Sequence, residues 1–126
     1  MAKEKFETEF YIRTSDSVLF NCMITPSGLE GWFADKVNIK GDVFTFLWEG
    51  EERSARLDSK KKDQWVKYVW LDDPAEATYM EMRIRIDDMT NDLALVITDF
   101  AEPADVKDAK MILETAVDEL KRILGS

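Results

Sequence analysis

The chain has 126 residues, enough for one domain over residues 1–126, and its 45% hydrophobic content is that of a globular protein. Its net charge of −9 argues against binding to nucleic acid or to anionic lipid surfaces, because both are bound mainly through Lys and Arg. The absence of histidine excludes Ser-His-Asp and Cys-His catalysis, and one cysteine, Cys22, can form neither an intramolecular disulfide nor a thiolate zinc site.

The first predicted elements are a strand followed by two short helices. The strand is predicted to be half-buried, because its inward-facing residues alternate with more polar ones. The first set is Phe6, Thr8, Phe10 and Ile12, and the second is Glu7, Glu9, Tyr11 and Arg13. Ser15 or Asp16 can cap the first helix. Its apolar residues are Val18, Leu19, Cys22 and Met23. Residues 25–28 are expected to end this helix, and residues 29–33 to form a second, shorter helical turn.

Six further strands follow, separated by short connections that are rich in turn residues. They are predicted at residues 37–40, 43–48, 54–58, 65–71, 78–87 and 93–100. Short connections indicate that neighbouring strands pair antiparallel. On the strand at residues 78–87, Met80, Met82, Ile84 and Ile86 form the apolar face, whereas either face of the strand at residues 43–48 can turn inward.

The last 24 residues, from Pro103, predict one long amphipathic helix, because apolar residues recur in alternating steps of three and four. This stripe consists of Val106, Ala109, Leu113, Ala116, Leu120 and Ile123, widened by Ile112, Val117 and Leu124. A helix of this kind must bury its apolar face, and the partner that the chain offers is its own sheet.

The segment around the two short helices resembles a known superfamily. The residues concerned are Ser15-Asp16-Ser17-Val18-Leu19-Phe20, then Thr25-Pro26-Ser27-Gly28-Leu29, and then Trp32-Phe33. They are similar to the opening of the START-like, or helix-grip, domains, and within them to the branch named after the activator of the Hsp90 ATPase. Leu19 stands where that branch usually has Trp.

This resemblance implies an α+β, Bet v 1-like fold, in which a curved seven-stranded antiparallel sheet wraps around the long carboxy-terminal helix and two short helices follow the first strand. Members of the superfamily bind lipids, sterols, polyketides or plant hormones between the sheet and this helix. The branch has no common catalytic motif, so we expect neither a catalytic residue nor a cofactor.

The preferred hypothesis is therefore a non-enzymatic module that holds an apolar or amphipathic small molecule between the sheet and the helix. The candidate ligand-binding residues are Trp32, Phe33, Trp48, Tyr68, Trp70, Met82, Leu113, Val117 and Leu120. A dry apolar void of ~400 Å³ would cost ~10 kcal/mol, so we expect a modest cavity filled by side chains, water or ligand. The alternatives are a protein-interaction module of the Hsp90-cochaperone type, with a protein partner, and a polyketide-cyclase-like enzyme.

Two clusters of charged residues are interpreted as solvated turns rather than as binding sites. The acidic residues at 87–92 lack the spacing of a calcium loop, so no metal is expected, and Lys60-Lys61-Lys62 is more typical of a hairpin tip than of a nucleic-acid site. No apolar run reaches the ~20 residues that span a bilayer, and the first residues lack the apolar core of a signal peptide. We therefore expect a cytoplasmic protein without membrane insertion.

Overall fold

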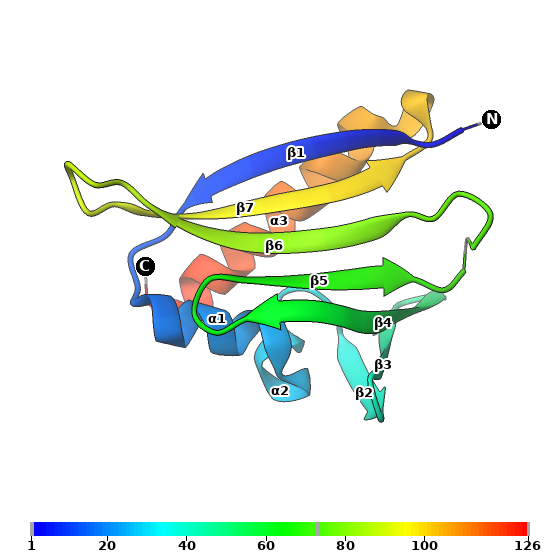
Figure 1. Cartoon of the computed structure of the whole chain (residues 1–126), viewed down its shortest axis with the longest axis horizontal. Coiled ribbons are helices and arrows are strands. Elements are labelled where there is room, and N and C mark those ends of the chain that lie inside the picture. The colour runs from blue at the N-terminus through cyan, green and yellow to red at the C-terminus, as the bar shows by residue number, and fades with distance from the viewer. Residues whose placement is uncertain (1, 73, 126) are drawn as a thin grey trace.

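The computed structural model describes residues 2–72 and 74–125, and it confirms the predicted order of one strand, two short helices, six strands and a long helix (Figure 1). The elements are β1 (Glu4–Tyr11), α1 (Asp16–Ile24), α2 (Pro26–Leu29), β2 (Lys36–Lys40), β3 (Val43–Trp48), β4 (Glu51–Lys61), β5 (Trp65–Trp70), β6 (Tyr79–Ile86), β7 (Leu93–Ala101), a 3-10 turn at Pro103–Asp105, and α3 (Val106–Leu124).

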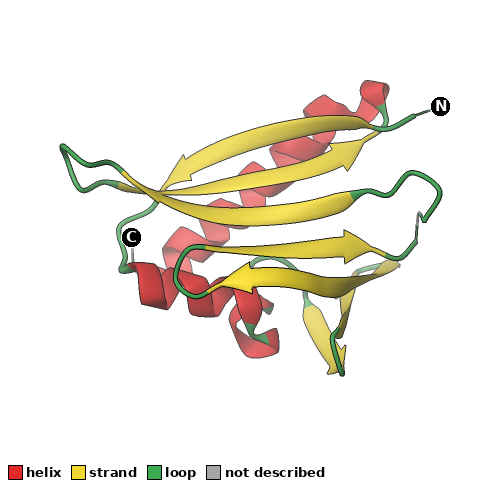
Figure 2. Cartoon of the chain, in the orientation of Figure 1, coloured by secondary structure: helices red, strands yellow, loops and turns green. Residues whose placement is uncertain are grey.

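The seven strands form one antiparallel sheet in the order β1-β7-β6-β5-β4-β3-β2. Strands that follow one another in the chain are therefore neighbours, except that β1 pairs with the last strand, β7. Figure 2 shows α3 running obliquely behind this sheet, and α3 contacts β1 and β7. The result is a curved sheet covered on one face by the long helix, as the resemblance implied.

The two short helices are defined by their caps. The Ser15 hydroxyl accepts the backbone N–H of Val18 at 3.2 Å, which starts α1. The Thr25 hydroxyl accepts the N–H of Gly28 at 2.9 Å, and Pro26 occupies the first turn of α2. The prediction that residues 25–28 only end the first helix, with a second turn at residues 29–33, was wrong. Thr-Pro is a helix start signal here, and α2 begins at Pro26.

The core lies between the concave face of the sheet and the helices. On β3, whose inward face the sequence left open, Phe44 and Phe46 turn into the core. On β6, Met80 and Met82 are fully buried, but Ile86 is exposed. The expected burial of Ile86 fails because β6 and β7 run out to a hairpin that projects beyond the helices (Figure 1).

The long helix buries a narrower stripe than predicted. Leu113, Val117 and Leu120 are buried, whereas Ile112 and Ile123 are 67% and 52% exposed, and Val18 on α1 is also exposed. A convex helix touches a curved sheet along a line, so the flanking apolar residues remain outside the contact. The helix also starts later than Pro103, since residues 103–105 form a 3-10 turn. In the described part of the chain, no helix combines the length and apolar character needed to cross a membrane.

The buried stripe leads to a first prediction. Leu113→Ala should lower the free energy of unfolding by ~2–5 kcal/mol, because Leu113 is only 6% exposed and its removal leaves a cavity. The adjacent Glu114 is exposed, so Glu114→Ala should change stability by less than ~0.5 kcal/mol. Urea titrations of the two variants test this, and equal losses would mean that the buried face of α3 is assigned wrongly.

Candidate functional site

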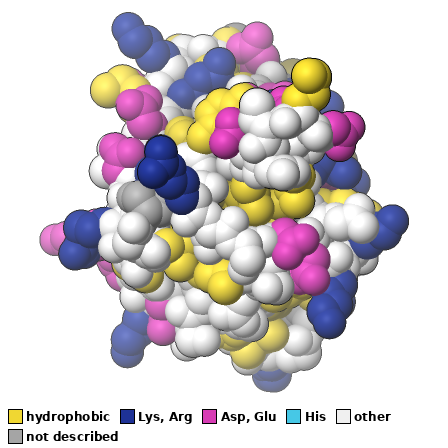
Figure 3. Space-filling view, turned by 90° about the vertical axis from the view of Figure 1, so that its left-hand side faces the viewer, with side chains coloured by type: hydrophobic (Ala, Val, Ile, Leu, Met, Phe, Trp, Pro, Cys, Tyr) yellow, Lys and Arg dark blue, Asp and Glu magenta, His cyan; other side chains and the backbone are white. Residues whose placement is uncertain are grey.

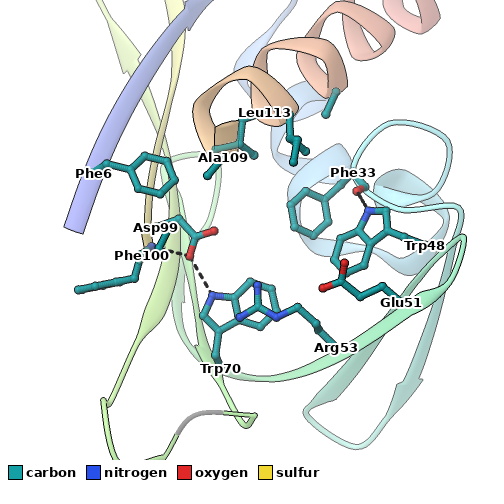
Figure 4. A pocket seen from close by; sticks show the side chains of 13 residues that line it. Phe6, Phe33, Trp48, Glu51, Arg53, Trp70, Asp99, Phe100, Ala109 and Leu113 are labelled. Carbon is teal, nitrogen blue, oxygen red and sulfur yellow. Dashed lines mark hydrogen bonds between the residues drawn. The ribbon is translucent and has the colours of Figure 1, made fainter. Parts of the chain in front are cut away.

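A pocket of about 390 Å³ opens between the first half of α3 and the concave side of the sheet (Figure 4). It is lined by Phe6, Phe33, Trp48, Glu51, Arg53, Trp70, Asp99, Phe100, Ala101, Ala109, Ile112, Leu113 and Ala116. The pocket exists partly because α3 presents small side chains there. Ala109 and Ala116 leave the helix surface recessed on either side of Leu113.

The aromatic wall of the pocket is held in place by its own contacts. The Trp48 indole N–H donates to the backbone carbonyl of Phe33 at 2.7 Å, and the two rings meet edge-on with centroids 5.6 Å apart. Behind them lies the buried Phe46 ring, whose centroid is 5.0 Å from that of the Phe33 ring and 5.9 Å from that of the Trp70 ring. Edge-on aromatic pairs of this kind stabilise one another, so the wall is formed before any ligand arrives.

Asp99 brings a carboxylate to this apolar space. Its Oδ1 accepts the Trp70 indole N–H at 2.9 Å and the backbone N–H of Phe100 at 2.8 Å. Burial nevertheless raises the pKa of Asp99 above its ordinary value, because desolvation outweighs these hydrogen bonds and the positive charges of Arg53 and Lys3. The pocket therefore contains a carboxyl group whose ionised form is disfavoured by its surroundings.

Arg53 supplies the positive charge of the pocket, and Asp72 largely balances it. The Arg53 Nε and Nη2 atoms donate to the two Asp72 oxygens at 2.7 and 3.3 Å, and this contact lowers the pKa of Asp72. The Arg53 guanidinium also lies 3.7 Å from the centroid of the Trp70 ring. Arg53 is thus fixed against the wall, while the exposed Glu51 adds a second carboxylate to the lining.

The structure brings four of the nine candidate ligand-binding residues to the pocket. These are Phe33, Trp48, Trp70 and Leu113. The other five are buried away from it, in the packed core; they are Trp32, Tyr68, Met82, Val117 and Leu120. The reason is visible in two of them. The Trp32 indole N–H donates to the carbonyls of Cys22 and Gly28, and the Tyr68 hydroxyl donates to the carbonyl of Met23 at 2.6 Å.

Sequence reasoning missed the polar residues of the pocket, and for Asp99 a signal was present. In β7, Leu95 and Ile97 are fully buried, and Asp99 continues their alternation on the same face. An acidic residue at an inward position of an apolar strand is uncommon, and it points to a special environment. Glu51 and Arg53 carry no such signal, because they stand in a run of charged residues beside Gly50, where a solvated turn is the ordinary expectation.

The remaining candidates have structural roles. Within residues 2–72 and 74–125, no group of three or more His, Cys, Asp or Glu side chains is arranged to hold a metal ion. The Asp87 carboxylate closes its own turn, since Oδ1 accepts the N–H groups of Met89 and Thr90 at 2.8 and 3.0 Å. Cys22 is buried, and burial raises the pKa of its thiol, as for an inert core cysteine.

A second hollow, of about 400 Å³, lies near the other end of α3 and is lined by Tyr11, Ile12, Arg13, Asp92, Leu93 and Lys121. Figure 3 shows this end of the molecule, where acidic and basic side chains stand among apolar ones. Its lining has no aromatic wall comparable to that of the first pocket, because the one aromatic residue there, Tyr11, is 59% exposed. The pocket beside Trp70 is therefore the stronger candidate site.

Comparisons with known proteins agree with this architecture. Residues 1–126 match the model of the START-like superfamily domain. The solution structure of BfR322 from Bacteroides fragilis is 36% identical, covers 98% of this chain and 93% of that chain, and has a TM-score of 0.65. No curated protein matches the chain.

Two more distant structures show the same fold. The solution structure of the Aha1 dimer from Colwellia psychrerythraea has a TM-score of 0.79 at 13% identity, covering 94% of this chain and 93% of that one. The crystal structure of CalU16 from Micromonospora echinospora has a TM-score of 0.72 at 12% identity, covering 97% and 74%.

Proposed function

The chain belongs to the START-like superfamily, and we propose that it binds an apolar or amphipathic small molecule in the pocket between α3 and the sheet, without catalysing a reaction. The observation that carries this proposal is the aromatic-walled pocket itself. Its volume of about 390 Å³ falls within the range of small-molecule sites, and its lining combines many apolar side chains with a few polar groups.

The energetics of the pocket support an occupant. A dry apolar void costs ~24 cal/mol per Å³, so a space of this size is expected to hold water or a ligand. Water gains little against the rings of Phe33, Trp48 and Trp70, whereas an apolar molecule gains the transfer free energy of the area it buries. The preformed wall also lowers the ordering cost of binding.

A binding role fits the chemistry of the lining better than a catalytic one. The titratable groups of the pocket are Asp99, Glu51 and Arg53, and Arg53 is engaged by Asp72. In this proposed role Asp99 and Arg53 hold and orient the ligand, and neither acts as a general acid, a general base or a nucleophile. We also propose a cytoplasmic location, because the buried Cys22 needs no oxidising compartment.

Filling the pocket tests the proposal. Ala109→Phe should weaken binding of the neutral fluorescent probe N-phenyl-1-naphthylamine at least about tenfold, since the new ring occupies the space beside Leu113. Fluorescence titration of the probe measures this. Met111→Phe is the matched control, because Met111 is on the exposed side of α3 and its replacement should leave probe binding unchanged.

Two results would contradict the proposal. Equal probe affinity in Ala109→Phe and in the unmodified protein, with the fold intact by circular dichroism, would locate binding elsewhere. Failure of the unmodified protein to bind the probe, combined with no thermal shift across fatty acids, sterols and aromatic polyketides, would leave a protein-interaction module as the better hypothesis.

A further inference from the structure

The Asp99 carboxylate uses its two oxygens differently. Both of its hydrogen bonds, from the Trp70 indole and from the backbone N–H of Phe100, end on Oδ1. In Figure 4 the other oxygen, Oδ2, points toward the middle of the pocket, on the side of Phe6 and Ala109. The fold thus fixes the carboxylate through one oxygen and presents the second to whatever fills the pocket.

The two hydrogen bonds to Oδ1 do not explain why this residue is an acid. An asparagine would offer the same carbonyl oxygen to Trp70 and Phe100 without the charge. The charge is unfavourable to the fold, because desolvation raises the pKa of Asp99 in the folded state. A carboxyl group with a raised pKa in the folded state lowers the free energy of unfolding as the pH rises through that pKa. Charged groups that reduce stability within a cleft are a mark of functional sites.

The charges around the pocket favour one class of ligand. Asp99 and Glu51 are both acidic, and the guanidinium of Arg53 is shared with Asp72 outside the pocket. Lys3 also acts on Asp99 with its positive charge, yet burial remains the dominant influence. The chain has a net charge of −9, so its electrostatic field repels an anionic head group.

We infer that the ligand of this pocket has an apolar body with a hydrogen-bond-donating head group, a hydroxyl or an amine, which donates to Oδ2 of Asp99. This inference rests on the proposed binding function and narrows it. It makes Asp99 the residue that determines head-group specificity. It places carboxylates such as fatty acids among the poor ligands, because a carboxylate has no N–H or O–H to donate to Oδ2 and brings a second negative charge close to Asp99.

A matched set of molecules that share an unbranched ten-carbon chain tests this inference at pH 7. Dissociation constants are measured by displacement of N-phenyl-1-naphthylamine with 1-decanol, decylamine, decyl methyl ether and decanoate. The unmodified protein should bind decanol and decylamine about tenfold more tightly than the ether and decanoate, since a hydrogen bond to a charged, partly buried carboxylate is worth about this factor.

Asp99→Asn is the decisive variant, because it keeps the acceptor for Trp70 and Phe100 and replaces Oδ2 by an N–H₂ donor. It should lose about tenfold in preference for decanol over the ether and gain affinity for decanoate. Asp118→Asn is the matched control, because it removes one negative charge from the exposed side of α3, outside the pocket lining, and it should leave the preference for decanol unchanged. The melting temperature of Asp99→Asn at pH 7 should equal or exceed that of the unmodified protein, and this advantage should shrink as pH falls.

The outcomes separate the two proposals. Equal affinities for decanol and decyl methyl ether in the unmodified protein, or an unchanged preference in Asp99→Asn, would overturn the role of Asp99 and leave apolar binding in place. Binding of neither the fluorescent probe nor any of the four molecules would overturn the binding function and this inference with it.

Discussion

Deletion of residues 103–126 should abolish cooperative unfolding of the remaining chain. The deleted segment carries α3, whose Leu113, Val117 and Leu120 are buried against the sheet. Without the helix, the concave face of β1 and β7 would be open to water, and a sheet with one large uncovered apolar face has no second layer to complete its core (Figure 1). The loss should approach the whole net stability of a typical domain, ~5–15 kcal/mol.

Urea titration followed by far-UV circular dichroism measures this effect. The control is a full-length chain in which three exposed residues of α3, Lys107, Glu114 and Asp118, are replaced by Ala. This control should keep a single transition near the original midpoint, because it changes the solvent face of the helix alone. A truncated chain that still unfolded in one transition at the same midpoint would show that α3 is not part of the core.

Much of this fold is predictable because its signals are local. The strand at residues 43–48 is a short apolar run between turn residues, and it has the predicted bounds in β3, Val43–Trp48. Short connections predicted antiparallel pairing, and the sheet order follows from them everywhere except at the pairing of β1 with β7. That long-range pairing was not predicted, since no local pattern joins the first strand to the last.

Strand length was less predictable, because it depends on the neighbouring strands. β4 was expected at residues 54–58 but runs from Glu51 to Lys61. Its charged ends lack the apolar alternation of a strand, yet they pair with β3 on one side and β5 on the other. The register with β5 shifts between Leu57 and Ser59, and no sequence pattern announced this irregularity.

The site was predicted only in outline, for a physical reason. Alternation shows which face of a strand turns inward, but it does not show whether the interior is solid or hollow at that point. Tyr68 and Met82 turn inward and meet packed side chains, whereas Trp70 turns inward and borders the pocket. The difference depends on which residues of α3 face each strand residue. Where α3 presents the small Ala109 and Ala116, the space is left open as the pocket.

Phe46→Ala should be the most damaging single substitution in the sheet, with a loss of ~3–5 kcal/mol in the free energy of unfolding. Phe46 is fully buried, and its ring lies among those of Phe33, Trp48, Tyr68 and Trp70, with centroids 5.0 to 6.0 Å away. Its removal would leave a cavity bordered by several rings at once, and rigid rings close a cavity poorly. A urea titration measures the loss.

The same substitution should also affect the pocket, because Phe33, Trp48 and Trp70 line it and all rest on Phe46. Phe46→Leu fills most of the space and should recover more than half of the lost stability, together with most of the affinity for N-phenyl-1-naphthylamine. Tyr11→Ala is the control, an aromatic truncation at a residue that is 59% exposed, and it should change neither stability nor probe binding appreciably. If Phe46→Ala and Tyr11→Ala reduced stability equally, the aromatic cluster would not be what holds the pocket wall, and the preformed shape of the site would need another explanation.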